Sequence, residues 1–489
     1  MGAKVLHTAV IACSLFLASQ APALGVCHAV TPSGSGSKNG SNWSNAMAGL
    51  PATLAAGDTY YLADGTYTGY IMTSSGTVSA QIVVRKAVAT GDYGQNCSPS
   101  IASGWNGSTM GSSQALFSST FYIRGAYFTL DGQTRNADWT GGGVKVIAPT
   151  CSGGGTTYGI PVDNFGAAPM PYVTLQYVEI EGGGYGLSPD TCFQTGIYAV
   201  NTLDISHLTV QYSYIHDLAG QPFTIEGTSN ALIQYNFVAR NNSTATNHSQ
   251  GLQSVNDSNA VIRYNKWLDI VGSGVIIVLG GDGPSIAADW SIYGNLMYWT
   301  PGNPNAAYIN NGIPLQTGDG VIGCINAQIC SGWQIYNNTI VGANWLSGEK
   351  SGIMFVNSPT SGDMTVKNNL WDNCIGAALV ATGGATLLHD YNTFISSTGY
   401  PTETNGATGS TDPFVNTATF DFRLTQDMDA AANSGGQWAQ GVALSSPFNL
   451  DLTSTPRGAD GTWDRGAYEF NSGTAERPNP PVLRALSVQ

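Results

Sequence analysis

The chain has 489 residues with a formal net charge of −14, and only 10% of its residues are charged while 62 are glycine. This composition is typical of a turn-rich all-β protein and argues against a helical or a disordered chain. The acidic balance argues against nucleic acid as a partner, because that binding needs a cationic surface. Binding of an acidic polysaccharide stays compatible with the negative net charge, because an acidic protein can still carry a local cationic patch that binds such a polymer.

The first 23 residues predict a secretory signal peptide. Lys4 and His7 precede an apolar stretch at residues 9–18, and residues 21–23 offer small side chains at the cleavage positions. We therefore expect a secreted, extracellular chain that begins near Leu24 and acts as a monomer. The apolar stretch is too short to cross a bilayer, and no later segment is a candidate, so we expect no membrane span.

Eight cysteines are present, and Cys13 lies within the signal segment. The remaining number is odd, so at least one thiol stays free or pairs between chains. Cys324 and Cys330 flank a short loop and form the pair that we favour, with Cys151 and Cys192 as a second candidate. Neither spacing resembles a zinc site, and we expect structural roles in an exported protein.

The segment after the signal predicts the closed end of an elongated fold. Residues Trp43 to Leu54 carry apolar side chains at helical spacing, so we expect a short amphipathic helix that caps exposed strands. Strands are predicted at residues 59–62 and 82–86 and within residues 121–130. We expect one domain over residues 24–470, followed by a loose tail at residues 471–489.

One short phrase recurs down the middle of the chain. It reads Gln211-Tyr212-Ser213-Tyr214-Ile215 at its first clear occurrence, and each later copy has an asparagine followed two residues on by an apolar side chain. Such a repeat, made of short β-branched and aromatic runs, predicts a right-handed parallel β-helix in which coils stack on one another. The recurring positions are Asn236, Asn265, Asn295, Asn338, Asn369 and Asn392.

The recurring asparagines have two interpretations. Asparagine tolerates left-handed backbone angles and can hydrogen-bond to the same position in the next coil, so we expect a buried asparagine ladder at one corner. The alternative is that these residues are ordinary turn formers on unrelated strands. The constant register of the following apolar residue favours the ladder.

Both ends of the chain resemble a known group. The opening segment from Gly57 to Tyr67, the segment from Asp412 to Leu424 and the closing Arg465-Gly466-Ala467-Tyr468-Glu469 resemble exported bacterial right-handed β-helix proteins of the pectate-lyase-like superfamily, with a choice-of-anchor type of C-terminal motif. The resemblance implies the fold and export. It does not select a function, because that superfamily holds lyases, hydrolases, epimerases and adhesins.

Alignment of the coils on the repeated phrase predicts two columns of outward side chains, which we interpret as a surface that binds polysaccharide. Amides, aromatic rings and cations gather there, and these groups suit sugar hydroxyls, sugar faces and carboxylates respectively. An ordinary polar β-helix face is the alternative. The predicted substrate-binding residues are Gln211, Tyr214, Gln234, Phe237, Arg263 and Lys266.

A third column gives the candidate catalytic residues. Asp217, Arg240 and Asp269 stand four positions after the corner of three successive coils, and His216 and His248 lie beside them. Histidine suits proton transfer near neutral pH. The alternatives are a salt-bridge ladder and histidines bonded to backbone carbonyls. An active site requires these five residues to converge in one cleft.

Known catalytic patterns are not found in the corresponding strands. The β-helix lyases carry a lysine in one coil and Arg-His-Gly in the next, whereas residues 251–257 and 274–280 contain neither. The Asp pairs with Gly-His-Gly of polygalacturonase-type hydrolases are also missing. Calcium is conceivable at the loop carboxylates Asp257, Asp282 and Asp319, although Asp-Gly pairs are commonly turns. We expect no other cofactor.

The sequence thus predicts an exported β-helix protein that acts on or binds extracellular polysaccharide, and it favours an enzyme, a polysaccharide lyase or a glycoside hydrolase, that cleaves an acidic, uronate-containing glycan. The alternative is a non-catalytic surface or adhesive protein of the same fold.

Overall fold

The computed structural model describes residues 25–150, 155–184, 192–241, 250–271, 274–279, 286–301, 320–325, 329–343, 354–429 and 436–470. The predicted signal segment, the predicted tail, His248, Asp282, Asp319 and the pair Cys151 and Cys192 therefore lie outside the residues or side chains described. Among the described residues no helix is long and apolar enough to cross a membrane.

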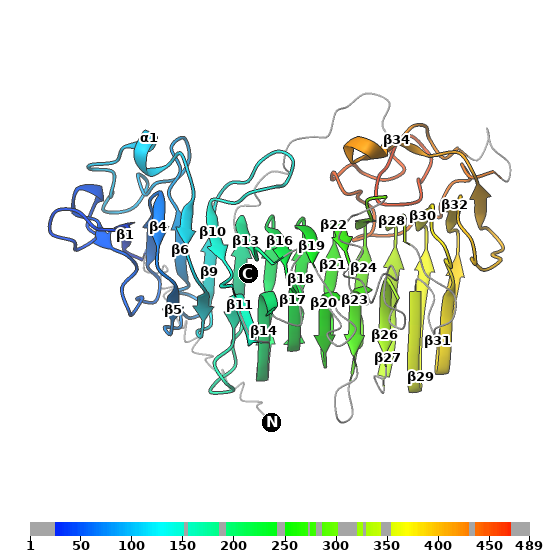
Figure 1. The fold of residues 1–489 in the computed structure, drawn as a ribbon, viewed down its shortest axis with the longest axis horizontal. Helices are drawn as coiled ribbons and strands as arrows, with labels where there is room; N and C mark the ends of the chain where they lie inside the picture. Colours follow the sequence, from blue (N-terminus) through cyan, green and yellow to red (C-terminus); the bar gives the residue numbers. More distant parts are fainter. Residues whose placement is uncertain are drawn as a thin grey trace, which may run out of the picture.

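The chain winds into a right-handed parallel β-helix, which confirms the predicted fold. Figure 1 shows the coils side by side along the long axis, in sequence order from blue to yellow. Two long parallel sheets form the described coils. Sheet A contains β1 Cys27–Thr31, β2 Met47–Ala48, β3 Thr59–Leu62, β5 Tyr70–Met72, β6 Ile82–Lys86, β8 Phe121–Ile123, β9 Phe128–Asp131, β11 Gly155–Val162, β12 Val173–Gln176, β14 Cys192–Ser206, β15 Thr209–Gln211, β17 Phe223–Ser229, β18 Leu232–Gln234, β20 Gln250–Val255, β21 Val261–Arg263, β23 Gly274–Leu279, β24 Ser291–Tyr293, β26 Ile322–Ile325, β27 Ile329–Tyr336, β29 Met354–Lys367 and β31 Leu379–Asp390.

Sheet B runs alongside sheet A and carries the surface of interest. Its strands are short, and each pairs in parallel with its neighbours in the next coils. They are β4 Gly65–Tyr67, β7 Ala115–Phe117, β10 Val144–Ile147, β13 Val178–Glu181, β16 Tyr214–Leu218, β19 Phe237–Asn241, β22 Lys266–Ile270, β25 Leu296–Tyr298, β28 Thr339–Val341, β30 Leu370–Asp372, β32 Thr393–Ile395 and β33 Ala407–Gly409.

The core fills the inside of the coils because the side chains of each strand alternate between inside and outside. The apolar residue two positions after each ladder residue points inward in sheet B and stacks on its equivalent in the next coil. This column is buried throughout and makes each coil depend on its neighbours for coverage. It comprises Ile215, Val238, Trp267, Met297, Ile340, Trp371 and Phe394.

The asparagine ladder is confirmed. Each ladder side chain accepts hydrogen bonds from the backbone N–H and the side-chain amide of the asparagine in the preceding coil, as Asn265 does from Asn236, both at 3.0 Å. Ser213 begins the ladder by donating its N–H to Asn236 Oδ1 at 3.0 Å. Glu403 ends it by accepting from Asn392. Buried polar groups are thus paired along the corner.

The backbone of the corner differs from our expectation. The left-handed angle belongs to the residue before each ladder position, with φ of 55° at Tyr212, 54° at Tyr235 and 55° at Tyr264. The ladder asparagines are thereby free to point inward. The tyrosine rings stack outside the corner, with centroids 5.2 Å apart for Tyr212 and Tyr235 and 5.1 Å apart for Tyr235 and Tyr264.

The N-terminal end is closed differently from the prediction. The amphipathic helix expected from Trp43 to Leu54 is wrong, because that segment holds one 3-10 turn, η1 Trp43–Asn45, and strand β2, which pairs with β1. A hydrophobic cluster around Trp43 and a disulfide between Cys27 and Cys97 fix this end. The short helix α1 Gly107–Met110 also belongs to it.

The structure tests the predicted cysteine pairs. The pairing of Cys324 with Cys330 is confirmed, whereas the Cys27–Cys97 bond was not predicted. Cys374 is a free, buried thiol among the described residues.

After β33 the chain folds back over the coils. Residues 410–470 contain the antiparallel pair β34 Phe414–Asn416 and β35 Asp421–Leu424 and the 3-10 turn η4 Thr417–Thr419. Figure 1 shows this orange and red segment above the later strands of sheet B. A second hydrophobic cluster joins it to the stacked tyrosines of the corner. We call residues 410–470 the C-terminal clasp.

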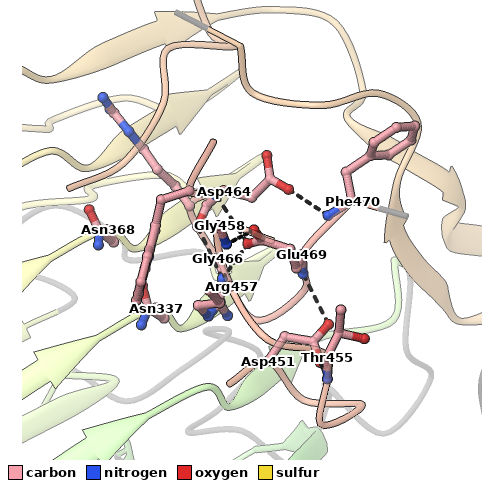
Figure 2. A network of polar contacts seen from close by, with 12 residues as sticks. Asn337, Asn368, Asp451, Thr455, Arg457, Gly458, Asp464, Gly466, Glu469 and Phe470 are labelled. Carbon is pink, nitrogen blue, oxygen red and sulfur yellow. Dashed lines mark hydrogen bonds and ion pairs between the residues drawn. The ribbon is translucent and has the colours of Figure 1, made fainter. Parts of the chain in front are cut away.

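The clasp is held by a buried polar network (Figure 2). Arg457 Nη1 lies 3.4 Å from Glu469 Oε2, and the Glu469 N–H donates to Asp451 Oδ2 at 3.0 Å. Trp463 Nε1 donates to Asn337 Oδ1 of the coils at 3.3 Å. The closing motif that carried the sequence resemblance therefore folds the chain back onto the β-helix.

Candidate functional site

A groove of about 420 Å³ lies on the outer face of sheet B. Its floor is the first outward column of the sheet, in which Tyr214, Phe237, Lys266 and Leu296 stand on successive coils. The predicted register of this column is therefore correct. Equivalent residues of neighbouring coils lie roughly 4.8 Å apart, so the groove runs along the β-helix axis.

Two segments distant in sequence form the walls of the groove. On one side lies the loop between β9 and β10, with Asp138 and Thr140. On the other side lies the C-terminal clasp, with Thr419, Phe420 and Phe422. The loop is anchored by Arg135, whose Nη1 donates to the Tyr235 carbonyl at 2.5 Å. Lys266 Nζ lies 4.4 Å from the centroid of the Trp139 ring, so a cation–π contact also links floor and loop.

Arg240 also lines the groove and connects it to a network of charges. Its Nε and Nη2 donate to the two carboxylate oxygens of Asp217 at 2.5 and 2.8 Å, and Nη2 also donates to Tyr214 Oη at 3.0 Å. His216 Nδ1 lies 2.6 Å from Asp217 Oδ2, and its Nε2 lies 3.3 Å from Glu179 Oε1. His216 thus bridges two carboxylates.

The network keeps its members charged. Burial would raise the pKa of Glu179, but hydrogen bonds from His216, Lys145 and Gln114 hold it down to about 2. Burial likewise opposes ionisation of Asp217, yet Arg240 and His216 hold its pKa below the usual range. Burial disfavours the imidazolium of His216, but the two carboxylates raise its pKa. The favoured state is therefore an ion-pair network, as the salt-bridge alternative expected for Asp217 and Arg240.

One group of side chains has the composition of a metal site. Ligand atoms of Glu179, Glu181 and His216 lie within 4.8 Å of one another. The ammonium of Lys145 already lies among them, 2.7 Å from Glu179 Oε1 and in contact with Glu181 Oε2. A built-in cation thus meets these carboxylates, and the site does not need a metal for charge balance.

Other predicted residues lie elsewhere. Gln211, Gln234 and Arg263 stand in one register column at the end of sheet A, which the sequence alignment of coils predicted. They do not line the groove. Instead Gln234 Nε2 donates to Gln211 Oε1 at 2.7 Å, and Arg263 Nε donates to Gln234 Oε1 at 2.7 Å. These side chains form a polar ladder parallel to the asparagine ladder.

Two predicted carboxylates serve turns. Asp269 does not line the groove, because its oxygens accept the N–H and the hydroxyl of Thr300 at 2.7 and 2.9 Å. Asp257 is fully buried and accepts from the N–H and the hydroxyl of Thr228 at 2.5 and 2.6 Å. The five candidate catalytic residues therefore do not all converge on the groove, as far as they are described.

The aromatic floor is more limited than the sequence suggested. Tyr214 stacks on His216 with centroids 3.9 Å apart and on Phe237 with centroids 5.2 Å apart. Its ring faces are thus largely occupied within the protein. Phe237 and the clasp residues Phe420 and Phe422 supply the apolar surface that stays available at the groove.

Sequence reasoning missed Lys145, Glu181 and the groove walls. Lys145 lies in a coil that precedes the asparagine repeats, so the repeated phrase did not align it. The alternation Val144-Lys145-Val146 was the available signal for an outward cation. The walls had no local signal, because they come from segments more than seventy positions away from the floor residues in sequence.

Comparison with known proteins gives a fold only. No family model matches the chain, and no curated protein matches it. Among solved structures, XylC in complex with xylose matches at 10% identity and a TM-score of 0.50, over 91% of this chain and 98% of that chain. Pectate lyase Pel9A matches at 16% identity and a TM-score of 0.43, over 92% and 97% of the two chains. An alginate lyase from Paenibacillus sp. str. FPU-7 matches at 15% identity and a TM-score of 0.35, over 73% and 92%.

The likeness to XylC agrees with the parallel β-helix fold of this chain. At such low identity the likeness concerns the fold alone, and function must be argued from the groove.

Proposed function

We propose that the protein is exported and binds an acidic polysaccharide in the groove on sheet B. The observation that carries the proposal is the placement of Phe237, Arg240 and Lys266 on the lining of one groove. An apolar ring suits the face of a sugar, and guanidinium or ammonium groups suit its carboxylate.

The shape of the groove supports a chain-like ligand. The groove runs along the axis of a solenoid whose coils repeat the same side-chain positions, so successive sugar units can meet successive coils. Its volume of about 420 Å³ lies within the ordinary range of ligand sites. XylC, which shares the fold, was solved with a sugar, xylose, and this agrees with the proposal without carrying it.

Binding without cleavage at this groove is the second candidate, and one observation favours it. His216, Asp217 and Arg240 bind one another, and the network keeps them charged. No member of this trio is then left as a neutral base. A surface or adhesive protein would use the same groove for attachment.

The test is a binding panel on the mature chain. Isothermal titration calorimetry with pectate, alginate, hyaluronan and a neutral xylan, with and without calcium, would be followed by assays for new reducing ends and for ultraviolet absorbance of unsaturated products. We expect binding of the uronate polymers that weakens as salt rises. Binding of xylan alone would remove the acidic ligand from the proposal, and no binding of any polymer would remove the proposal itself.

A further inference from the structure

A second hollow, of about 270 Å³, continues the groove toward the C-terminal coils. Tyr298 of β25 lines both spaces, and the turn η4 covers both, with Thr417 at the hollow and Thr419 at the groove. A glycan chain that lies in the groove would therefore reach the hollow along the same face of sheet B.

Two carboxylates from different segments line this hollow, and the charge of one acts on the other. Asp372 ends β30 and belongs to the second outward column of sheet B, in register with Val341 and Ile395. Asp412 belongs to the clasp and is exposed, and its Oδ1 accepts the N–H of Phe414 at 2.9 Å. Both residues line the hollow.

Asp372 is buried without a side-chain partner. Its exposed fraction is 7%, and no described side chain donates a hydrogen bond to its carboxylate. The neighbouring N–H of Asn373 favours its charged form, but that N–H also donates to the Ile395 carbonyl at 2.9 Å. A buried carboxylate with so few donors is costly to ionise, so this environment favours its protonated form.

The rest of the hollow suits a sugar. Trp299 is fixed by a hydrogen bond from its Nε1 to the Ile270 carbonyl at 2.9 Å, and it supplies an aromatic wall next to Tyr298. The hydroxyl-bearing residues Ser396, Ser410 and Thr417 also line the space. Calcium fits less well, because it takes six to eight oxygen ligands, and the lining contains two carboxylates.

We infer that Asp372 and Asp412 form the catalytic pair of a glycoside hydrolase, with Asp372 as general acid and Asp412 as the base that activates water. The inference rests on the proposed binding of a polysaccharide in the adjoining groove.

The reaction balances with water as the only co-reactant. Asp372 donates its proton to the glycosidic oxygen while the bond from that oxygen to the anomeric carbon breaks and its electron pair stays on oxygen. Asp412 accepts a proton from a water molecule whose oxygen forms the new bond to the anomeric carbon. The proton on Asp412 then returns to Asp372 through solvent, and nothing is oxidised or reduced.

The environment of Asp372 agrees with the acid role. Burial, followed by the negative charge of Asp412, raises the pKa of Asp372 to about 7. A carboxyl with such a pKa still holds its proton in mildly acidic and neutral solution, as a general acid must.

The test compares Asp372→Asn and Asp412→Asn with Asp460→Asn, which changes an exposed carboxylate of the clasp. Rates of reducing-end release from pectate, alginate, hyaluronan and xylan, and dissociation constants for the same polymers, would be measured on all three variants. We expect each of the first two to lose at least about 100-fold in kcat with less than a threefold change in the dissociation constant. Asp460→Asn should behave like the original chain.

Thermal unfolding shows whether Asp372→Asn keeps the fold, and Asp412→Asn tests the pair at an exposed position where folding is not at risk. The wild-type rate should also fall as pH rises above about 7, because burial and the charge of Asp412 raise the pKa of Asp372 to about 7.

Four outcomes would overturn the inference. They are unchanged activity in either variant, unsaturated products in place of plain reducing ends, binding without cleavage of any polymer, and a thermal stabilisation by calcium that Asp372→Asn abolishes. Binding without cleavage leaves the proposed function standing, whereas the absence of all binding overturns the proposed function itself.

Discussion

Arg240 holds both carboxylate oxygens of Asp217 through Nε and Nη2, at 2.5 and 2.8 Å, and so joins two successive coils at the edge of the groove. Both residues have φ of 57° and occupy equivalent positions of β16 and β19. The planar fork of arginine matches a carboxylate in a way that lysine does not. Asp217 in turn contacts His216, so this pair links the groove to the charges of His216 and Glu179.

Binding should depend on the floor of the groove. We expect Phe237→Ala and Lys266→Ala each to weaken polysaccharide binding about tenfold, because each removes a contact worth about 1–1.5 kcal/mol. Lys38→Ala and Phe165→Ala are matched controls, since both residues are exposed and neither lines the groove. Calorimetric titration with pectate and alginate gives the dissociation constants. Equal losses in the controls would show that the effect is not local to the groove.

The charge network should stabilise the fold in a defined pH range. Glu179 has a pKa of about 2 in the folded protein against an ordinary 4.5, so its contribution is complete above pH 4.5 and is lost as pH falls toward 2. The expected size is on the order of 2–3 kcal/mol. Denaturant unfolding of the original chain and of Glu179→Gln at pH 6 and pH 3 measures it.

We expect the stability difference between those two chains to shrink at pH 3. Glu226→Gln is the control, because Glu226 is exposed on sheet A. A difference that stays constant between the two pH values contradicts this assignment of Glu179.

Replacement of one asparagine in the ladder should lower the free energy of unfolding strongly. Asn265 accepts from the Asn236 N–H and side-chain amide at 3.0 Å, and donates to the Ile233 carbonyl at 2.9 Å and to Asn295 at 3.0 Å. Asn265→Ala leaves these buried groups unpaired, so we expect a loss of about 2–4 kcal/mol. Chemical denaturation checks this, with the exposed Asn39→Ala as reference. A loss below about 1 kcal/mol would mean that water replaces the side chain.

The two disulfides should differ in their effect on stability. Cys27 and Cys97 are 70 residues apart, whereas Cys324 and Cys330 are 6 apart. A cross-link restricts the unfolded chain more when it closes a longer loop, which gives about 4 kcal/mol for the first bond and about 2 kcal/mol for the second. Thermal unfolding of the two double Cys→Ser variants tests the order. The reverse order would indicate that the N-terminal end already unfolds separately.

Ligand binding in the groove should require a docked C-terminal clasp. Glu469→Gln replaces a buried carboxyl that lies beside Arg457 and whose two oxygens accept the N–H groups of Gly458 and Asp464. An amide has one acceptor oxygen, so one of these buried donors loses its partner. We expect the clasp to loosen, with a loss of about 1–3 kcal/mol in its docking, and binding in the groove to fall with it because Phe420 and Phe422 line the groove. Hydrogen exchange of residues 410–429 reports the docking directly, and Asp460→Asn is the control.

Proteolysis gives an independent readout of the same change. New cleavage within residues 436–470 should appear in Glu469→Gln and stay absent in the control. Full binding with a cleaved clasp would show that the wall is dispensable.

Much of the repetitive part of this molecule can be predicted from local pattern. The apolar residue two positions after each ladder asparagine predicted both the inward column from Ile215 to Phe394 and the register of the outward columns. This works because side-chain direction alternates in a strand and each coil packs on its nearest neighbours. The helix expected at residues 43–54 failed because tertiary packing of Trp43 overrode a weak helical spacing.

Only some residues of the candidate sites could be predicted from the sequence. Tyr214, Phe237, Arg240 and Lys266 were found because they belong to the repeat, and they meet in one groove. Asp269 was chosen by the same column, yet it bonds to Thr300, because a column fixes the position of a side chain in its coil and not the partner that it meets in the next one.

The solenoid, its asparagine ladder and the side chains of each face follow from the sequence pattern, because they depend on contacts between equivalent positions of adjacent coils. The return of the clasp is a matter of tertiary structure, and that return places Asp412 on the lining of the same hollow as Asp372 and Phe420 on the lining of the same groove as Phe237. The physical reason is that the return of the clasp depends on a buried charge network and on packing against stacked tyrosines far away in sequence. No local propensity encodes those contacts.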